Sequence, residues 1–205
     1  MAKTVYLTTP LTEEAVRDLH IDDTVYLSGE LVTMIYDFHY KRTLECYKKG
    51  EATPFKLGDG SAVYHCPAGF KRNEDGTYDL RFVGSTTSSK FNVYTPEFME
   101  LTGVRAIIGK GGMNKEVLEA MKKLGGVYLA VAGGCSAIYT TGVEALEEEY
   151  WPQPSWADNI LKLRVKNFGP LTVAMDAHGN SIYEESGSAA QDNLPAIFDK
   201  LGIKK

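Results

Sequence analysis

The second half of the chain contains two consecutive segments in which a β-branched strand runs into a glycine-rich turn. The first joins Val104–Ile108 to Gly109-Lys110-Gly111-Gly112 and then to a helical stretch at Asn114–Leu124. The second joins Val127–Val131 to Gly133-Gly134 and to another stretch that is expected to be helical. Repeated strand, turn and helix in this order indicate parallel strands with helices packed on their faces. This pattern predicts an α/β layer.

Patterns elsewhere predict further strands and helices. Thr12, which is followed by two glutamates, is expected to cap a helix, and Thr95-Pro96-Glu97 has the composition of a helix start. Glu147-Glu148-Glu149 is interpreted as the solvated face of a helix that continues toward Tyr150. The remaining expected elements are strands at Asp23–Leu31, Ala62–Cys66, Tyr78–Val83, Leu161–Val165 and Leu171–Met175, and helices at Leu31–Tyr47 and Ala189–Leu201. Together they predict one α/β domain over residues 1–205, in which a half with a mixed sheet joins a parallel α/β half.

Composition excludes several classes of function. The net charge is −5, which gives no indication of the basic face that nucleic acid binding requires. No apolar run approaches the roughly 18 residues of a membrane helix, and the N-terminus lacks a signal-peptide pattern, so we expect a cytoplasmic protein. Cys46, Cys66 and Cys135 are far apart in sequence and match neither a disulfide framework nor a metal site. They are interpreted as buried structural thiols.

The turn Gly109-Lys110-Gly111-Gly112 is the first candidate for chemistry. Glycines between a strand and a helix let backbone N–H groups approach an anion, and the lysine adds a positive charge. The spacing matches neither a Walker A loop nor G-x-G-x-x-G. The turn therefore predicts an anion site that suits a carboxylate as well as a phosphate, and a tight turn with a surface lysine is the alternative.

The second candidate is the hydroxyl-rich loop Gly84-Ser85-Thr86-Thr87-Ser88-Ser89-Lys90. Such a loop can bind an oxyanion or present one reactive hydroxyl, although a hydroxyl needs stabilising neighbours to act as a base. A solvated loop is the alternative. His39 lies beside Tyr36 and Asp37 in an expected helix, where a half-buried structural histidine is the alternative to a site residue. Asp176-Ala177-His178-Gly179-Asn180 has the composition of a turn.

These segments, taken in order, resemble a known family: the β subunit of two-subunit class I (iron–sulfur) fumarases and L-tartrate dehydratases, which is equivalent to the C-terminal domain of single-chain class I fumarases. The resemblance extends from about residue 4 to 185. The matching stretches are Leu7-Thr8-Thr9-Pro10-Leu11, Val25-Tyr26-Leu27-Ser28-Gly29, Leu31-Val32-Thr33, Val83-Gly84-Ser85-Thr86-Thr87-Ser88, Ile108-Gly109-Lys110-Gly111-Gly112-Met113, Ala132-Gly133-Gly134-Cys135 and Asp176-Ala177-His178-Gly179-Asn180.

The resemblance implies a swivelling β/β/α domain that takes part in the addition or removal of water at a small hydroxy acid. A four-iron–four-sulfur cluster on the α subunit would act as Lewis acid, this chain would bind no cofactor or metal itself, and the assembly would be α2β2. Carried over by position, Thr86 would abstract a proton, Lys110 would hold a carboxylate or stabilise enolate-like charge, and His39 would be a helix-borne site residue. The implied substrate-binding residues are Thr87, Ser88, Lys90, Gly111, Tyr36 and Asp37.

Two arginines of the family pattern are replaced. Where the family shows Thr-x-Arg-Asp-x-x-His, this chain has Ile35 and Tyr36 in place of the Arg–Asp pair and keeps His39. The arginine that follows the threonine loop is Lys90, which keeps the charge but not the planar fork that binds a carboxylate through two hydrogen bonds. An apolar residue at position 35 suits a substrate with a neutral group at that end, and it also suits a site that has lost catalysis.

Three hypotheses therefore stand. The first is an active hydro-lyase β subunit with a small hydroxy acid as substrate. The second is a non-catalytic ligand-binding or structural protein on the same fold, because the clamp arginines are lost. The third is a stand-alone protein that binds phosphate ligands through Lys110. No nucleotide-binding motif in the sequence supports it.

Overall fold

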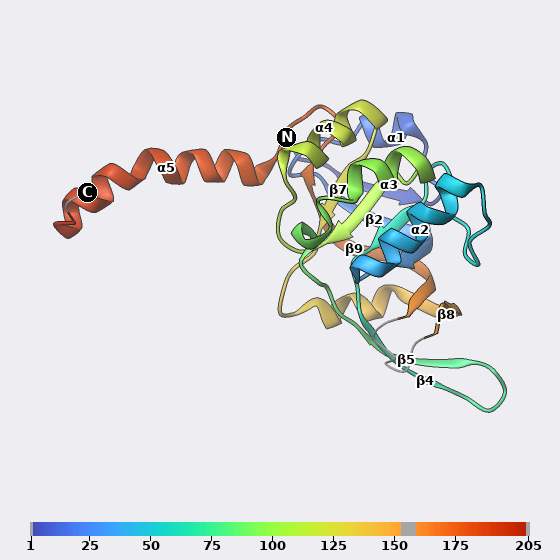
Figure 1. Cartoon of the computed structure of the whole chain (residues 1–205). Coiled ribbons are helices and arrows are strands. Elements are labelled where there is room, and N and C mark those ends of the chain that lie inside the picture. The colour runs from blue at the N-terminus through green and yellow to red at the C-terminus, as the bar shows by residue number, and fades with distance from the viewer. Residues whose placement is uncertain (1, 153–158, 204–205) are drawn as a thin grey trace.

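The structure, a computed structural model, describes residues 2–152 and 159–203 (Figure 1). Its strands are β1 (Thr4–Thr8), β2 (Thr24–Thr33), β3 (Ala62–Tyr64), β4 (Ala68–Arg72), β5 (Tyr78–Val83), β6 (Ala106–Gly109), β7 (Val127–Ala130), β8 (Val143–Tyr150) and β9 (Ile160–Met175). Its helices are α1 (Glu13–Arg17), α2 (Asp37–Lys49), α3 (Thr95–Thr102), α4 (Lys115–Leu124) and α5 (Ile182–Leu201), with the 3-10 helices η1 (Ser88–Phe91) and η2 (Ser136–Gly142). The predicted α/β fold class with a mixed sheet is confirmed.

The long strand β9 closes the main sheet on itself. Strands β1, β2, β3, β6 and β7 are neighbours in parallel, and β9 runs antiparallel to β7 and β8. β9 also pairs with β2, from Thr24 opposite Thr172 to Val32 opposite Lys162. The path from β2 through β3, β6, β7 and β9 therefore returns to β2.

Side chains alternate between the two faces of this closed sheet. Tyr64, Ile108 and Leu129 belong to one buried cluster with residues of β2 and β9. The residues before them in each strand belong to a second cluster, which includes residues of α2, α3 and α4. This period of two is what a strand with both faces buried requires. The sheet thus separates an inner core from a layer of helices.

Three differences from the sequence predictions have long-range causes. The helix expected from Leu31 begins only at Asp37, because Val32 and Thr33 are still in β2 and pair with β3. The stretch before Tyr150 is strand β8, not a helix, and it pairs with β9. The two strands predicted between residues 161 and 175 are one strand of 16 residues.

Smaller differences occur at element ends. Thr95 lies inside α3, and its hydroxyl donates to the carbonyl of Phe91, so it is not the capping residue. Strand β4 forms a hairpin with β5 that the sequence did not reveal. Helix α5 begins at Ile182, earlier than expected, and projects from the body in Figure 1. Thr12 caps α1 as predicted.

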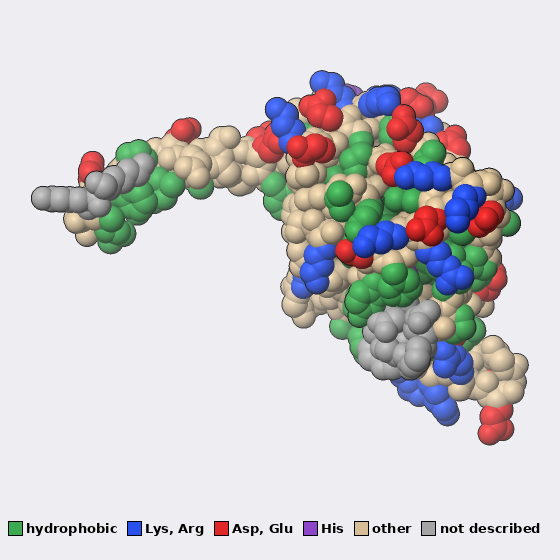
Figure 2. All heavy atoms as spheres, in the orientation of Figure 1, with side chains coloured by type: hydrophobic (Ala, Val, Ile, Leu, Met, Phe, Trp, Pro, Cys, Tyr) green, Lys and Arg blue, Asp and Glu red, His purple; other side chains and the backbone are tan. Residues whose placement is uncertain are grey.

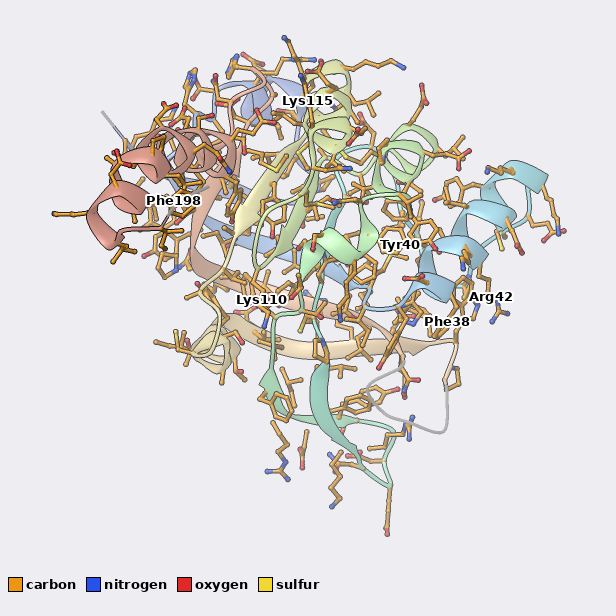
Figure 3. The ribbon with its side chains drawn as sticks, turned by 60° about the vertical axis from the view of Figure 1, so that its left-hand side comes forward. Phe38, Tyr40, Arg42, Lys110, Lys115 and Phe198 are labelled. Atoms are coloured by element: carbon orange, nitrogen blue, oxygen red, sulfur yellow. The ribbon has the colours of Figure 1, made fainter. Side chains whose placement is uncertain are left out.

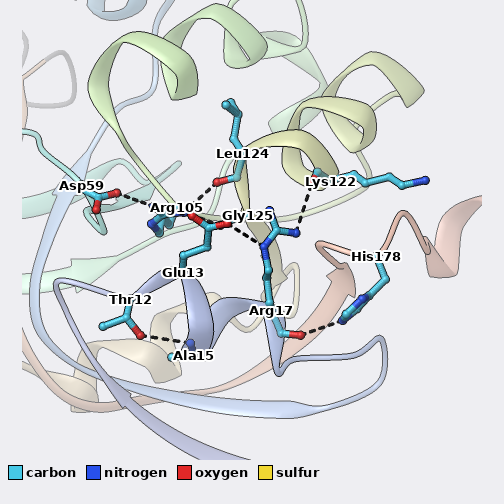
Figure 4. A network of polar contacts seen from close by, with 10 residues as sticks. All are labelled: Thr12, Glu13, Ala15, Arg17, Asp59, Arg105, Lys122, Leu124, Gly125 and His178. Carbon is cyan, nitrogen blue, oxygen red and sulfur yellow. Dashed lines mark hydrogen bonds and ion pairs between the residues drawn. The ribbon is translucent and has the colours of Figure 1, made fainter.

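The amino ends of the parallel strands are joined by a polar network (Figure 4). Arg105, just before β6, donates to the carbonyl oxygens of Leu124 and Gly125, which precede β7. Its guanidinium also pairs with Glu13 of α1 and with Asp59. This cation is largely buried, so its hydrogen bonds hold α1 and the end of α4 against one edge of the sheet. The carboxyl ends of the same strands lie at the opposite edge of the sheet.

The charge distribution on the surface is mixed. Figure 2 shows basic and acidic side chains interspersed over the helical face, without a continuous basic area on the face in view. Among residues 2–152 and 159–203, no helix combines the length and apolar character that a membrane span needs.

Asp176 is the centre of the turn that follows β9, as its sequence predicted. Its buried carboxylate accepts hydrogen bonds from the backbone N–H groups of Ile21, His178 and Asn180 and from the Asn180 amide. Burial alone would raise the pKa of this carboxyl, but the four hydrogen bonds outweigh it and the pKa is lowered.

We expect Asp176→Asn to lower the free energy of unfolding at pH 7. A lowered pKa in the folded state stabilises the protein above the ordinary carboxyl pKa, and this contribution is lost as the pH falls through the lowered value. The difference from wild type should therefore narrow below about pH 4 in urea titrations. Glu119→Gln, which removes an exposed helix charge of the same sign, is the control. A pH-independent difference would contradict this account.

Candidate active site

The hydroxyl loop and the glycine–lysine turn meet at the carboxyl ends of β3 and β6. The Thr86 N–H donates to the carbonyl of His65 at 2.8 Å, and the Lys110 N–H donates to the carbonyl of Thr86 at 3.3 Å. The Ser88 N–H in turn donates to the carbonyl of Lys110 at 3.1 Å. The loop therefore lies between the two strand ends as a short extension of the sheet. Two candidates that are separate in sequence are one feature of the structure.

The functional groups at this edge are a cation and two hydroxyls. Thr86, Thr87 and Lys110 are all half-buried, and Thr87 and Lys110 form an isolated parallel bridge. The stem of Lys110 lies along the loop after β7, since a Cβ atom on Gly133 would be 3.5 Å from its Cδ. In the part of the chain that the structure describes, no carboxylate pairs with Lys110, and neither threonine hydroxyl makes a hydrogen bond. A small anion could therefore bind here.

A buried chain of hydrogen bonds lies beneath this loop. The Tyr40 hydroxyl is 2.6 Å from His65 Nε2, His65 Nδ1 is 2.8 Å from Ser88 Oγ, and the Tyr128 hydroxyl donates to Ser88 Oγ at 2.9 Å. Burial lowers the pKa of His65 to about 3, so the imidazole is neutral at physiological pH. Burial raises the pKa of both tyrosines. The four side chains are therefore an uncharged network.

Sequence reasoning missed three members of this network. His65 belongs to no recognisable motif, and Tyr40 and Tyr128 resemble ordinary core residues in the sequence. Their positions on α2, after β3 and on β7 follow no local pattern. The available signal was the polar group that each of these aromatic side chains carries, since buried polar groups need partners.

Ser88 and His39 lie away from the surface. Both are fully buried. His39 Nδ1 accepts a hydrogen bond from the Ile35 N–H, which stabilises the turn between β2 and α2. The structure thus does not bring either side chain to a substrate-accessible position, and their predicted contacts with a substrate stay predictions.

The start of α2 presents two exposed aromatic rings. Tyr36 is 41% exposed and Phe38 is 37% exposed, and their rings stack at 5.9 Å. Asp37 accepts a hydrogen bond from the Tyr94 hydroxyl. Figure 3 shows Phe38 and Lys110 on the side of the body from which the β4–β5 hairpin projects. Lys90 is exposed in η1, and Gly111 is exposed next to Thr87.

The cysteines of this chain do not fit an iron–sulfur cluster. Cys66 is buried, which raises the pKa of its thiol, whereas Cys46 is half-buried and Cys135 is exposed. The expectation of three buried thiols is thus wrong for Cys135. Among residues 2–152 and 159–203, no three His, Cys, Asp or Glu side chains are grouped as a metal site would require.

Three surface hollows lie away from this edge of the sheet, and two of them have a volume of about 480 Å³. One of these two is lined by residues such as Pro54, Phe55 and Leu57. Neither Thr86 nor Lys110 lines any of the three.

Comparison with known proteins gives consistent relatives. Residues 1–186 match the family model described as "Fumarase C-terminus". The chain is 39% identical over 194 residues to a putative L(+)-tartrate dehydratase subunit beta of Methanocaldococcus jannaschii, covering 94% of this chain and 98% of that protein. It is 34% identical over 195 residues to the L(+)-tartrate dehydratase subunit beta of Escherichia coli K12, covering 95% of this chain and 94% of that protein. A putative fumarate hydratase class I of Geobacillus stearothermophilus is 33% identical over 94% of this chain and 36% of that protein.

We expect Gly109→Ala to destabilise the protein through a steric clash beneath the hydroxyl loop, because the backbone of Gly109 is not in the left-handed region and the substitution causes no backbone strain. A Cβ atom at this position would lie 2.0 Å from Ser88 Oγ and 3.2 Å from His65 Nδ1. Overpacking of this kind lowers the free energy of unfolding by about 1–3 kcal/mol. Chemical denaturation would measure this loss of stability. Gly187→Ala is the control, because no atom lies within 4 Å of a Cβ built on Gly187. Equal stability of the two variants would show that the Ser88 contact is not tight.

Proposed function

This chain belongs to the fumarase C-terminus family as a hydro-lyase β subunit, and we propose that it adds or removes water at a small hydroxy acid together with a cluster-bearing α subunit. The observation that carries the proposal is the junction of the hydroxyl loop with the Lys110 turn at one edge of the sheet. The family membership supplies the reaction class, and this edge supplies the groups.

Lys110 is the anion-binding group in this proposal. Its ammonium is free of acidic partners in the described part of the chain, and its stem rests on the Gly133 loop. A carboxylate of the substrate would satisfy this charge. Lys90 provides a second, exposed cation at the rim. Both are point charges rather than planar forks, so they hold a carboxylate with less directional selectivity than arginines would.

Thr86 is the proposed proton-abstracting group. Its backbone is bonded on both sides, to His65 and to Lys110, so its position is well defined while its hydroxyl stays free. A threonine hydroxyl cannot act as a base unaided, because its pKa lies far above 7 and almost none of it is present as the alkoxide. It therefore requires neighbouring positive charge that stabilises the alkoxide. The adjacent Lys110 can contribute such charge, and it can also stabilise the enolate-like charge that forms when the proton leaves.

The partner completes the site in this proposal. The cysteines of this chain do not fit a cluster, so the four-iron–four-sulfur cluster is expected on the α subunit. The exposed ring of Phe38, on which the Tyr36 ring stacks, lies on the same side of the body as Lys110 (Figure 3). An α2β2 assembly and a cytoplasmic location are parts of the same proposal.

One observation favours the non-catalytic alternative. Ile35, which replaces an arginine of the family pattern, is only 8% exposed, and its backbone N–H is bonded to His39. No carboxylate can be recognised at that position. The two candidates differ in whether the assembled complex turns over a hydroxy acid at all.

The decisive experiment isolates the complex anaerobically from native cells, measures its iron and sulfide, and assays a panel of hydroxy acids. We expect turnover in the complex and none in the isolated chain. Thr86→Ala should lower kcat by about 10²-fold or more, since it removes the proposed base. Lys110→Ala should raise KM and lower kcat.

Lys123→Ala is the matched control, because this lysine is an exposed cation on α4 that pairs with Glu100. It should behave as wild type. Wild-type turnover in Thr86→Ala would refute the role of Thr86. A complex without iron that acts on no hydroxy acid would favour the non-catalytic alternative.

A further inference from the structure

We propose that His65, Ser88, Tyr40 and Tyr128 are positioning residues, which together hold the Thr86 hydroxyl and Lys110 in register for the reaction. This inference rests on the proposed function for its catalytic consequence. The geometry itself does not depend on that function. It also gives Ser88 a role different from direct contact with a substrate.

The network joins side chains from four parts of the fold. Tyr40 comes from α2, His65 follows β3, Tyr128 lies on β7, and Ser88 opens η1 at the end of the hydroxyl loop. All four side chains are fully buried. The three hydrogen bonds that join them, of 2.6, 2.8 and 2.9 Å, therefore have no water to compete with them.

Ser88 transmits this network to the reactive groups through the backbone. The Ser88 N–H donates to the carbonyl of Lys110, and the Lys110 N–H donates to the carbonyl of Thr86. The Thr86 N–H in turn donates to the carbonyl of His65. The side chain of Ser88 is thus anchored to the same histidine that anchors Thr86. A shift of Ser88 would move the loop against Lys110.

Packing leaves Ser88 no alternative position. The missing side chain of Gly109 makes room for its Oγ, which would be 2.0 Å from a Cβ atom there. Apolar residues of the same size would fill this space without needing partners, and burying four polar groups is costly unless each is bonded. Hydrogen bonds define distances and directions more strictly than apolar contacts do, which suits a positioning role.

The protons of the network have a consistent order. A neutral imidazole has one donor and one acceptor nitrogen. Because Tyr128 donates to Ser88 Oγ, all donors point the same way when Ser88 donates to His65 Nδ1 and His65 Nε2–H donates to Tyr40. In the described part of the chain, no hydrogen bond connects the network to the Thr86 hydroxyl itself. The network therefore positions the reactive group and does not exchange protons with it.

The test compares Tyr128→Phe, Tyr40→Phe and Ser88→Ala, each of which removes one hydroxyl. The first two each remove a single hydrogen bond of the network, whereas Ser88 makes two, so the tyrosine variants are the least disturbing to folding. Amide hydrogen exchange of the full-length chain is followed in the segments 84–91 and 108–113. We expect exchange in these two segments to become at least about tenfold faster, with the remaining segments unchanged. In the complex, kcat should fall by about 10–100-fold while KM changes less, since small misplacements of reacting groups cost this much.

Thr102→Val is the matched control, because it also removes a buried hydroxyl, one that donates to Phe98 within α3. Exchange and kcat equal to those of this control would overturn the proposal. The double variant Tyr40→Phe with Tyr128→Phe should cost less than the product of the two single effects, because the groups act as one unit. If the wild-type complex is inactive, the proposed function fails, and hydrogen exchange alone still decides the positioning role.

Discussion

The pairing of β9 with both β2 and β7 is the constraint on which the rest of this structure depends. It converts an open parallel sheet into a closed one and buries residues such as Leu163 and Val173 inside. Closure also fixes the outer face on which α2, α3 and α4 pack. The strands that carry the candidate site, β3 and β6, lie between these pairings, so their carboxyl ends have little freedom to move.

The two edges of the sheet are used differently. At the amino edge, Arg105 is bonded to carbonyl oxygens and paired with acids, so its charge is satisfied within the chain. At the carboxyl edge, Lys110 has no acidic partner in the described residues, and the neighbouring threonine hydroxyls are free. Lys110 and the two threonine hydroxyls thus lie where strands of α/β sheets commonly end in binding sites. This contrast, more than any single residue, identifies the functional edge.

The chemistry proposed for this edge depends on what the chain lacks as well as on what it has. Its cysteines are scattered between a helix, a strand end and an exposed loop. A hydro-lyase β subunit of this kind therefore contributes positioned polar groups, while the proposed partner contributes the enclosing surface. Ile35, which stands where the family pattern has an arginine, is buried within the turn before α2, and its N–H donates to His39 Nδ1.

The sequence by itself determined the strand–turn–helix unit from residue 104 to residue 124, the capped start of α1 and the turn around Asp176, because each follows from local periodicity, capping or turn chemistry. It also singled out the hydroxyl loop and Lys110 as separate candidates. Only the tertiary structure decided that these two candidates adjoin, that the acidic stretch before Tyr150 is a strand, and that His65 and Ser88 belong to one buried network. Strand pairing and burial join residues that are far apart in sequence, from 23 positions for His65 and Ser88 to 148 positions for Thr24 and Thr172. A local pattern carries no information about which distant partner will satisfy a strand edge or a buried hydroxyl.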